Sequence, residues 1–417
     1  MVYRNMGINS LAEYFLGIED SRDERGKRHR LIDILVLAVI GFLSGFTDFT
    51  NMCAEFRYKE DYYTELLGLP NGIPSHDTFS AVFSLIDPIK FLTQFIKWIN
   101  YYVNPAGQQI CIDGKAVRAA CDKVHKGKVP YIVNAFMSDL GISVGQLKIE
   151  EKTNEIKGIP ELLDLLQIEG ATITIDAIGC QHDVIEKIIW KGGHFVLAVK
   201  DNQKTLAEDI ELRFAPLLEE KAAKTAWAKE QSKLYGYKVK PEEIPDFDEF
   251  ITAERDHGRI EKRHYAVFNN TDCIDKELWP HIKSIGWVER ERLIVHKDKY
   301  GNILEEEPTV ETVAYAMSRE MTAEEFACFV RSHWRVENSL HWVLDDYFRE
   351  DRCTARKDNA TENMAMLRKI VLNLMTLDPN VKKMSKRAKG IYYQTHPEEA
   401  LNLLFNITPD AQPNLQA

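Results

Sequence analysis

Two aspartates stand where predicted β-strands end, a place at which a carboxylate is held rigidly. Asp113 follows Ile112 in QQICIDGKAV, and Asp176 follows Ile175 in ATITIDAIG. Side chains at strand ends project into the loop-built crevice where α/β proteins usually bind ligands. Mg²⁺ prefers oxygen ligands and keeps part of its water, so a few carboxylates and a substrate phosphate can hold it. Two such ions, about 4 Å apart, can activate an attacking oxygen and stabilise a leaving one in phosphodiester chemistry.

A third acidic residue, Glu337, lies on a predicted helix. Side chains three or four residues apart can share one helix face. Four residues have this spacing: His333, Glu337, His341 and Asp345. The structural alternative is that this face is only solvated while three neighbours pack the other faces: Trp334, Leu340 and Trp342. A zinc site is a weaker alternative, because HExxH is absent and a third ligand would be arbitrary.

The elements that would position the two aspartates alternate between strand and helix. From Gln108 onward the predicted order is three strands, a helix, a strand, a helix and a strand: QQICIDGKAV, VPYIVNAFMSD, GISVGQLKIEE, GIPELLDLL, ATITIDAIG, VIEKIIWKGG and HFVLAVK. The second and third strands are joined by a turn at 139–141. Pro160 is expected in the first turn of its helix, where a missing N–H has no consequence. This order predicts a mixed sheet with helices on its faces.

Residues from about 203 to 315 interrupt this pattern with a charged helix followed by antiparallel strands and hairpins. Four residues alternate along one expected strand face: His257, Arg259, Glu261 and Arg263. They can grip DNA or form a cross-strand salt-bridge ladder, and the sequence leaves both open. A long helix then starts at Thr322, which has capping-box spacing to Glu325, and runs through Phe348.

The first hundred residues are predicted to be helical. The apolar run 31–46 contains Asp33 and is shorter than the roughly 20 residues that a membrane helix needs, so a buried helix is expected. A turn at Asn71, Gly72 and Pro74 precedes a helix that Ser75 or Asp77 can cap. Such a turn and helix can read DNA, but any helical bundle contains similar turns.

The net charge of −11 argues against a protein that coats nucleic acid, because neutralising phosphates requires a basic surface. The acidic residues are concentrated in the middle of the chain, however, and basic clusters occupy 22–30, 115–128, 349–357 and 382–389. A local track for DNA therefore remains open. Seven scattered cysteines without a CxxC pair, and the absence of a signal peptide pattern, predict a cytoplasmic protein.

Several separated blocks resemble one family of bacterial proteins. HWRVENSLHWVLDDYFREDRCTARKDNATENMAMLRKIVLNLM resembles the signature of insertion-sequence transposases of the ISAs type, which include the H-repeat-associated proteins. Four more blocks are similar to other parts of this family: NGIPSHDTFSAVFSLIDP, IDGKAVR, ITIDAIGCQ and DHGRIEKRHY. The blocks stand in the right order and span nearly the whole chain, so together they are specific.

The resemblance implies a DDE transposase, a polynucleotidyl transferase and endonuclease with a ribonuclease-H-like α/β core, Mg²⁺ or Mn²⁺, and cut-and-join chemistry at terminal inverted repeats. By motif, the catalytic and metal-binding triad is Asp113, Asp176 and Glu337. The second gap, 337 − 176 = 161 residues, is long because the β-rich insertion falls inside it. Related enzymes carry Tyr, Arg and Lys around the glutamate. Here Val330, His333 and Leu344 replace them, which leaves hairpin-type excision in doubt.

The family also implies partners and an organisation. The expected partners are double-stranded DNA, as terminal inverted repeats and as target, and a second copy of the chain in the DNA complex, without a membrane. Eight residues are expected to contact DNA, with solvated charge as the alternative for the first two: Lys115, Arg118, His257, Arg259, Arg263, Arg331, His333 and His341. The expected parts are a helical DNA-end-binding domain (1–105), the first part of the core (106–202), a β-rich insertion (203–315), the last part of the core (316–378) and a polar tail (379–417).

Two other functions remain compatible with these motifs. One is a catalytically decayed relict that only binds DNA ends. The other is a ribonuclease-H-like nuclease or resolvase that cuts without joining. Nothing in the sequence marks decay, since both aspartates and the glutamate are present.

Overall fold

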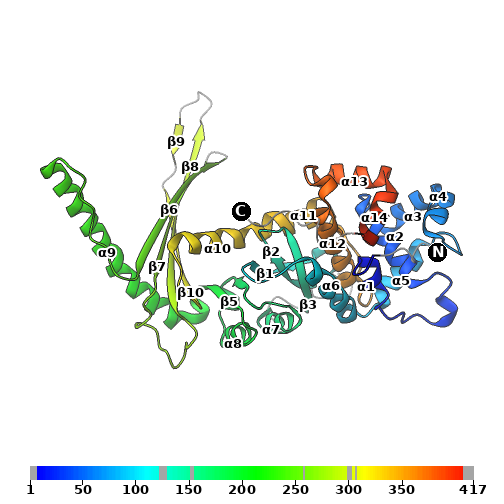
Figure 1. Ribbon diagram of the computed structural model, residues 1–417, viewed down its shortest axis with the longest axis horizontal. Coiled ribbons are helices and arrows are strands. Elements are labelled where there is room, and N and C mark those ends of the chain that lie inside the picture. Colours follow the sequence, from blue (N-terminus) through cyan, green and yellow to red (C-terminus); the bar gives the residue numbers. More distant parts are fainter. Residues whose placement is uncertain are drawn as a thin grey trace. The chain divides into compact units, whose positions relative to one another are not determined.

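The computed structural model describes residues 7–121, 129–150, 155–256, 259–297, 303–305 and 308–406 (Figure 1). The chain forms two compact units. The first contains Met1–Gln167 and Trp334–Ala417, and the second contains Ile168–His333. Each unit is described by itself.

The first unit begins with helices: α1 (Leu11–Phe15), α2 (Leu31–Leu43), α3 (Phe49–Tyr58), α4 (Glu60–Leu67), α5 (His76–Leu85) and α6 (Pro88–Tyr102). Ser75 caps α5 by accepting a hydrogen bond from the Thr78 backbone N–H, and Pro88 occupies the first turn of α6. Every residue of α2 is buried, so the expected buried helix is confirmed. Among the described residues no single helix has the length and apolar character to cross a bilayer. Helices α5 and α6 reach that length and apolar character only when taken together, and the two are bent by 90°.

Three antiparallel strands follow: β1 (Gln109–Ala116), β2 (Tyr131–Met137) and β3 (Ile142–Ile149). Gly141 has φ +68° in the turn between β2 and β3, which confirms the predicted hairpin. Helix α7 (Glu155–Leu165) packs on β3. The position predicted for Pro160 is wrong, because α7 already includes Glu155 and the proline is interior. Gly158, the first residue of the predicted helix, lies inside α7 and so close to β3 that an added Cβ would be 2.6 Å from Ile149.

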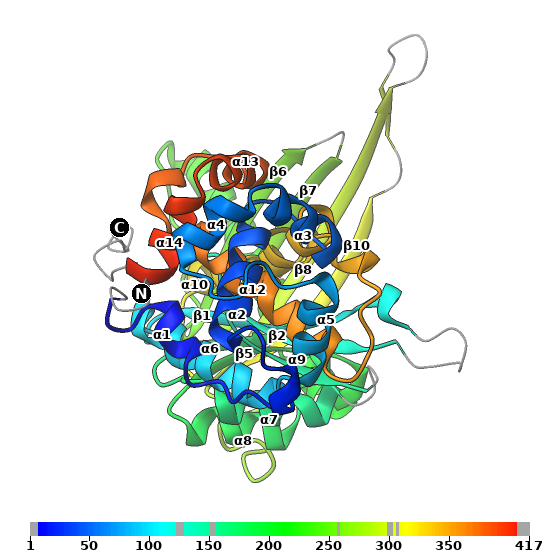
Figure 2. The same ribbon diagram turned by 90° about the vertical axis from the view of Figure 1, so that its right-hand side faces the viewer.

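The carboxy-terminal part of the first unit is also helical: α11 (Trp342–Asp346), α12 (Ala360–Leu377), α13 (Lys386–Thr395) and α14 (Pro397–Asn406). Helix α12 packs against β3, α2 and α5, and Figure 2 shows these helices gathered toward the viewer. Asn373 joins α12 to β3 through two hydrogen bonds with the backbone of Ser143, at 2.9 and 2.7 Å. Residues 379–406 were expected to be a polar tail, but they include two helices whose Tyr393 and Leu404 are fully buried.

The second unit contains the predicted strand, helix, strand order and the insertion. Its elements are β4 (Thr172–Ile175), α8 (His182–Trp190), β5 (His194–Val199), α9 (Lys204–Tyr235), β6 (Phe247–Asp256), β7 (Arg259–Phe268), β8 (Ser284–Lys297), β9 (Ile303–Glu305), β10 (Thr309–Met317) and α10 (Ala323–Val336). Strands β4 and β5 are parallel, and β5-β10-β8-β7-β6 continue antiparallel, with β9 on β8. The predicted mixed α/β class is therefore confirmed.

Helix α10 starts where the sequence predicts. The Thr322 hydroxyl accepts a hydrogen bond from the Glu325 backbone N–H at 3.2 Å. The apolar side of its first part, including Phe326 and Val330, packs on a core formed with Tyr265 and Met317. The last three residues of α10 already belong to the first unit.

Candidate metal centre

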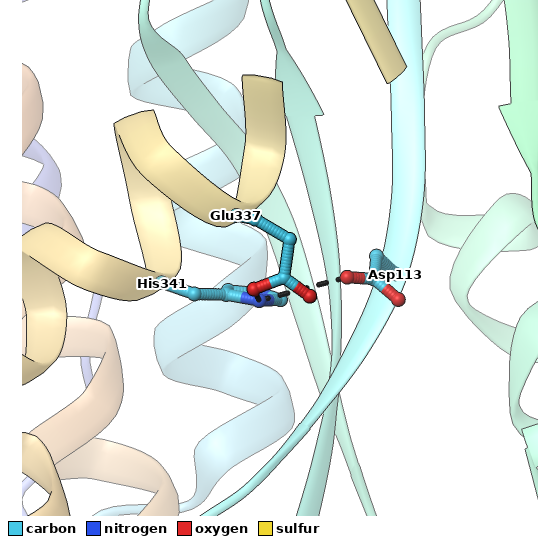
Figure 3. Close-up of side chains that lie close together, drawn as sticks. All are labelled: Asp113, Glu337 and His341. Carbon is cyan, nitrogen blue, oxygen red and sulfur yellow. Dashed lines mark ion pairs between the residues drawn. The ribbon is translucent and has the colours of Figure 1, made fainter. Parts of the chain in front are cut away.

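Asp113, Glu337 and His341 meet in the first unit (Figure 3). The His341 Nδ1 atom lies 3.5 Å from Asp113 Oδ2 and 3.4 Å from Glu337 Oε2. One ligand atom from each of the three residues lies within 4.8 Å of the others. The His341 side chain is 7% exposed, that of Asp113 22% and that of Glu337 59%, so the group opens to solvent on the glutamate side.

Asp113 was expected at the end of a strand, but β1 continues to Ala116, so Asp113 lies inside the strand and is held through its backbone. Asp113 pairs with Asn134 in the β1–β2 register, and the buried Asn134 amide donates to the carbonyl oxygens of Asp113 and Ile132 at 3.3 and 3.0 Å. The next residue, Gly114, donates its N–H to Asp113 Oδ1 at 2.9 Å. A Cβ at Gly114 would lie 2.1 Å from the Tyr131 ring, and the Tyr131 hydroxyl donates to the Gly114 carbonyl. Only glycine fits this position without displacing Tyr131.

Glu337 and His341 delimit a π-helical turn, η7 (Glu337–His341), between α10 and α11. The helix predicted as one regular element is therefore widened at the glutamate. Isolated π turns within α-helices are frequent at functional sites. Leu340 and His341 are buried on the inner side of this turn, while Glu337 is exposed.

The four residues expected on one helix face have different surroundings. Glu337 and His341 meet, whereas Asp345 pairs with Lys115 in the first unit. In the second unit, His333 Nδ1 lies 3.0 Å from Thr174 Oγ1 of β4. The expected packing of the neighbours is only partly correct. Leu340 is buried, but two tryptophans remain exposed, at 61% and 60%: Trp334 and Trp342.

Asp176 belongs to the second unit, where it follows β4 as expected. Its exposed side chain accepts a hydrogen bond from the Ile178 N–H at 3.1 Å and caps the short helix η5 (Ala177–Gly179). Asn202 donates to the Ala177 carbonyl at 2.6 Å, and Gln203 donates to the Cys180 carbonyl at 3.0 Å. These two amides, which the sequence analysis did not single out, brace the aspartate loop. The available signal was their position directly after the predicted strand HFVLAVK.

The donor atoms around His341 suit a divalent ion. Carboxylate oxygens are the ligands that Mg²⁺ prefers, and an imidazole nitrogen also suits transition ions such as Mn²⁺. Among the described residues His341 Nε2 is buried without a hydrogen-bond partner, whereas Nδ1 faces both carboxylates. The imidazole is thus oriented toward the two carboxylates and not toward a structural partner. The residues present fit a metal ion at this position.

Lys115 and Arg118 were expected to contact DNA just beyond Asp113. The Lys115 side chain is 10% exposed and pairs with Asp345 and Glu350. A surface contact to a phosphate does not fit this burial. Arg118 is exposed in the short helix η3 (Arg118–Ala120), which leaves such a contact open to it.

The charged residues of β6, β7, β8 and β10 form a cross-strand network. Arg263 pairs with Glu254 of β6 at 3.1 Å and with Glu261 of its own strand. Arg290 and Arg292 of β8 also approach Glu261, at 3.7 and 3.3 Å. For Arg263 the structure therefore shows the salt-bridge ladder that the sequence left open.

Two other expected DNA contacts lie near this network, and one lies outside the described residues. Arg331 of α10 pairs with Glu254 at 2.5 Å, and this hydrogen bond, with that from Arg263, holds the pKa of the Glu254 carboxyl below its usual value despite partial burial. Arg259 is exposed at the start of β7. His257 lies outside the described residues.

Comparisons with known proteins show which family the chain belongs to. Residues 12–99 match the family model described as DDE_Tnp_1-associated, and residues 104–374 match the transposase DDE domain. The "H repeat-associated putative transposase YhhI" of Escherichia coli (strain K12) is 34% identical over 376 residues, covering 89% of this chain and 92% of that protein. An "Uncharacterized protein in dhlA 3'region" of Xanthobacter autotrophicus is 35% identical over 269 residues, covering 64% of this chain and 83% of that protein.

A solved structure, the piggyBac transposase synaptic complex with hairpin DNA, aligns with all of this chain and 84% of its own, at 11% identity and a TM-score of 0.40. This likeness is too low to support any detail of the site. The family match, in contrast, covers the segment that contains Asp113, Asp176 and Glu337. It confirms the resemblance read from the sequence motifs. The chain belongs to the family of transposases with a DDE domain.

Proposed function

We propose that this protein is an active transposase that cleaves DNA and joins strands at the terminal inverted repeats of an insertion sequence, with Mg²⁺ or Mn²⁺ as cofactor. The observation that carries the proposal is the meeting of Asp113 and Glu337 around the buried His341, in a segment that matches the transposase DDE domain. Two carboxylates that face one site repel each other, and a bound cation would offset this repulsion.

Asp113 and Glu337 would hold the ion. Asp176 is assigned as the third carboxylate because it stands in the family's second aspartate motif. A bound divalent ion supplies positive charge that polarises a phosphodiester and lowers the pKa of a bound water. The backbone of β1 fixes Asp113, and the η5 cap orients Asp176. His341 orients both carboxylates of the first unit from the buried side.

The proposed partners are double-stranded DNA and, in the DNA complex, a second copy of the chain. We place this activity in the cytoplasm, at the nucleoid. Exposed cations at Arg118, Arg259, Lys382 and Lys383 are available for phosphate contacts in a chain whose net charge is −11. The alternative is a relict that binds DNA ends without cutting them.

The test is cleavage and joining of a labelled DNA end from the flanking repeats, with Mg²⁺ or Mn²⁺. Wild type is compared with Asp113→Asn, Asp176→Asn and Glu337→Gln, and Glu324→Gln serves as a control because this exposed glutamate lies in the first turn of the same helix. We expect wild type and the control to nick and join, and the three variants to bind DNA and lose about 100-fold or more of the rate.

Each alternative has its own result. Nicking without joined products would indicate a nuclease or resolvase. Binding without any cutting by the wild type would favour the relict. Variants that cut as fast as the wild type would show that the carboxylates are assigned to the wrong residues.

A further inference from the structure

Lys115 lies on β1 two residues after Asp113, and its ammonium group is inside the first unit. Nζ pairs with Asp345 of α11 and, at 2.7 Å, with Glu350 of the short helix η8 (Glu350–Arg352). The Lys115 side chain is 10% exposed and that of Glu350 is 2% exposed. Burying a cation is unfavourable unless carboxylates compensate it, so this arrangement needs a reason other than surface charge.

The spacing of these residues gives the reason. Alternate residues of a strand point to the same side, so Asp113 and Lys115 face one way, about 6.6 Å apart along β1. His341 and Asp345 are four residues apart on the helix, which is a rise of about 6 Å. Because the two spacings match, β1 and this helix meet at two successive points: Asp113 with His341, and Lys115 with Asp345. The first contact is in the metal centre, and the second fixes its register.

Further cations of α12 lie behind Lys115. Arg368 Nη1 is 3.9 Å from Glu350 Oε1, and Lys369 Nζ donates to Gln146 Oε1 at 2.7 Å. Burial raises the pKa of Glu350, but the charges of Lys115, Lys369 and Arg368 outweigh it and hold the pKa at about 2. If Lys115 is replaced, two cations still face Glu350. The contribution that only Lys115 makes is the link from β1 to Asp345.

We propose that Lys115 is a positioning residue of the metal centre, which holds the helix carrying Glu337 and His341 in register with the strand carrying Asp113. The inference rests on the proposed function, because it concerns the same site. Lys115 acts through Asp345 and Glu350 and contacts neither the ion nor DNA.

The test uses the full chain and measures Mn²⁺ binding without DNA, by electron paramagnetic resonance of the free ion, together with the thermal unfolding midpoint. Lys115→Met keeps much of the side-chain length and removes the charge. Lys90→Met is the matched control, because Lys90 pairs with Glu19 at the surface of the same unit. We expect Mn²⁺ binding to weaken about tenfold in Lys115→Met, with cleavage recovered at high metal concentration, and to be unchanged in Lys90→Met.

Asp345→Asn removes one half of the contact and leaves Lys115 with Glu350. We expect it to weaken Mn²⁺ binding in the same direction, and this variant decides the question if Lys115→Met does not fold. A lowered unfolding midpoint with wild-type Mn²⁺ binding in either folded variant would overturn the proposal. Asp113→Asn separates the two claims: if it also binds Mn²⁺ as the wild type does, the metal centre itself is misassigned and the proposed function fails.

Discussion

At the scale of single residues, His341 has the most informative surroundings. The sequence predicts a contact to DNA, whereas the structure buries the ring between two carboxylates. A group that holds metal ligands from the inner side sets their orientation, and loss of such a group typically weakens metal affinity by about 10–100-fold. His341 therefore belongs with Asp113 and Glu337 as part of one assembly.

The first prediction concerns this imidazole. His341→Ala should weaken Mn²⁺ binding by about 10–100-fold, because nothing then separates and orients the two carboxylates. His341→Asn, which keeps a polar group near the Nδ1 position, should lose less. His76→Ala is a suitable control, since His76 is half-exposed on α5. Calorimetric titration with Mn²⁺ measures the effect, and equal affinity in His341→Ala and wild type would exclude His341 from the centre.

The second prediction concerns acid stability. The Glu350 pKa is lowered from 4.5 to about 2 because the cations Lys115, Lys369 and Arg368 outweigh the effect of burial. In the unfolded chain Glu350 has its ordinary pKa, so its carboxylate becomes protonated at a higher pH than in the folded chain. The stabilisation is therefore complete above about pH 4.5 and is lost as the pH falls toward 2, with an upper limit of about 3 kcal/mol.

Glu350→Gln tests this, because the variant has no proton to bind at this position. Urea unfolding of both proteins at pH 6, 4 and 3 gives the measurement. We expect the free energy of unfolding of the wild type to fall more steeply with decreasing pH than that of Glu350→Gln. Parallel curves would show that Glu350 titrates alike in the folded and unfolded chains.

At the scale of elements, the π turn determines which side chains meet. A π turn contains about one residue more than an α turn, so it changes the directions of the side chains within it relative to one another. In this chain the widened turn spans Glu337–His341, between the part of the helix that packs in the second unit and the part that packs in the first. The turn thus sets the rotation of His341 and Asp345 relative to Glu337.

The third prediction is that deleting Asn338 abolishes the site while the fold survives. Asn338 is exposed in the π turn, and its removal allows a regular α-helix in which Glu337 and His341 are three residues apart instead of four, so their side chains take a new relative position. We expect Mn²⁺ binding to weaken about tenfold or more, with helical circular dichroism retained. Asn338→Ala keeps the turn and should bind as the wild type does. Equal binding by the deletion variant would mean that the turn is not needed for the site.

The elements also show what the sequence could predict and what it could not. Alternating and helical periodicities predicted β1, the β2–β3 hairpin, β4 and the start of α10, because each has a clear local signal such as the Thr322 cap. The π turn has no such signal, since ENSLH fits a regular helix equally well. The position of Pro160 was wrong because glycine and proline usually mark a helix boundary, whereas here Gly158 and Pro160 both stand inside α7.

At the scale of the whole molecule, the family motifs predicted more of the site than the periodicities did. Asp113, Asp176 and Glu337 come from motifs far apart in the chain, and the structure brings the first and the last together in the first unit. The burial of Lys115 could not be predicted, because its carboxylate partners lie 230 and 235 residues away. Residues 379–406 were predicted to be a polar tail for a similar reason. Their helices have polar outer faces, and their buried faces pack on distant partners such as α2.

The distribution of charge over the molecule leads to the last prediction. The net charge is −11, yet the segment around α13 carries five cations: Lys382, Lys383, Lys386, Arg387 and Lys389. Burial and, to a lesser extent, the nearby charge of Lys389 lower the pKa of Lys386 to about 8. In the part of the chain that the structure describes, Lys382 and Lys383 are exposed and form no ion pair, which suits phosphate contacts.

Replacing Lys382 and Lys383 by Gln should therefore weaken DNA binding and reduce its salt dependence. Each phosphate contact contributes about 0.9 to the slope of log affinity against log salt, so the double variant should lose about 2 from that slope. Lys229→Gln with Lys233→Gln is the control, because these exposed lysines of α9 give the same change in net charge at a different place. An equal loss in both double variants would mean that DNA senses only the net charge. A loss confined to 382 and 383 identifies a local contact, since long-range effects of charge are the same in the two proteins.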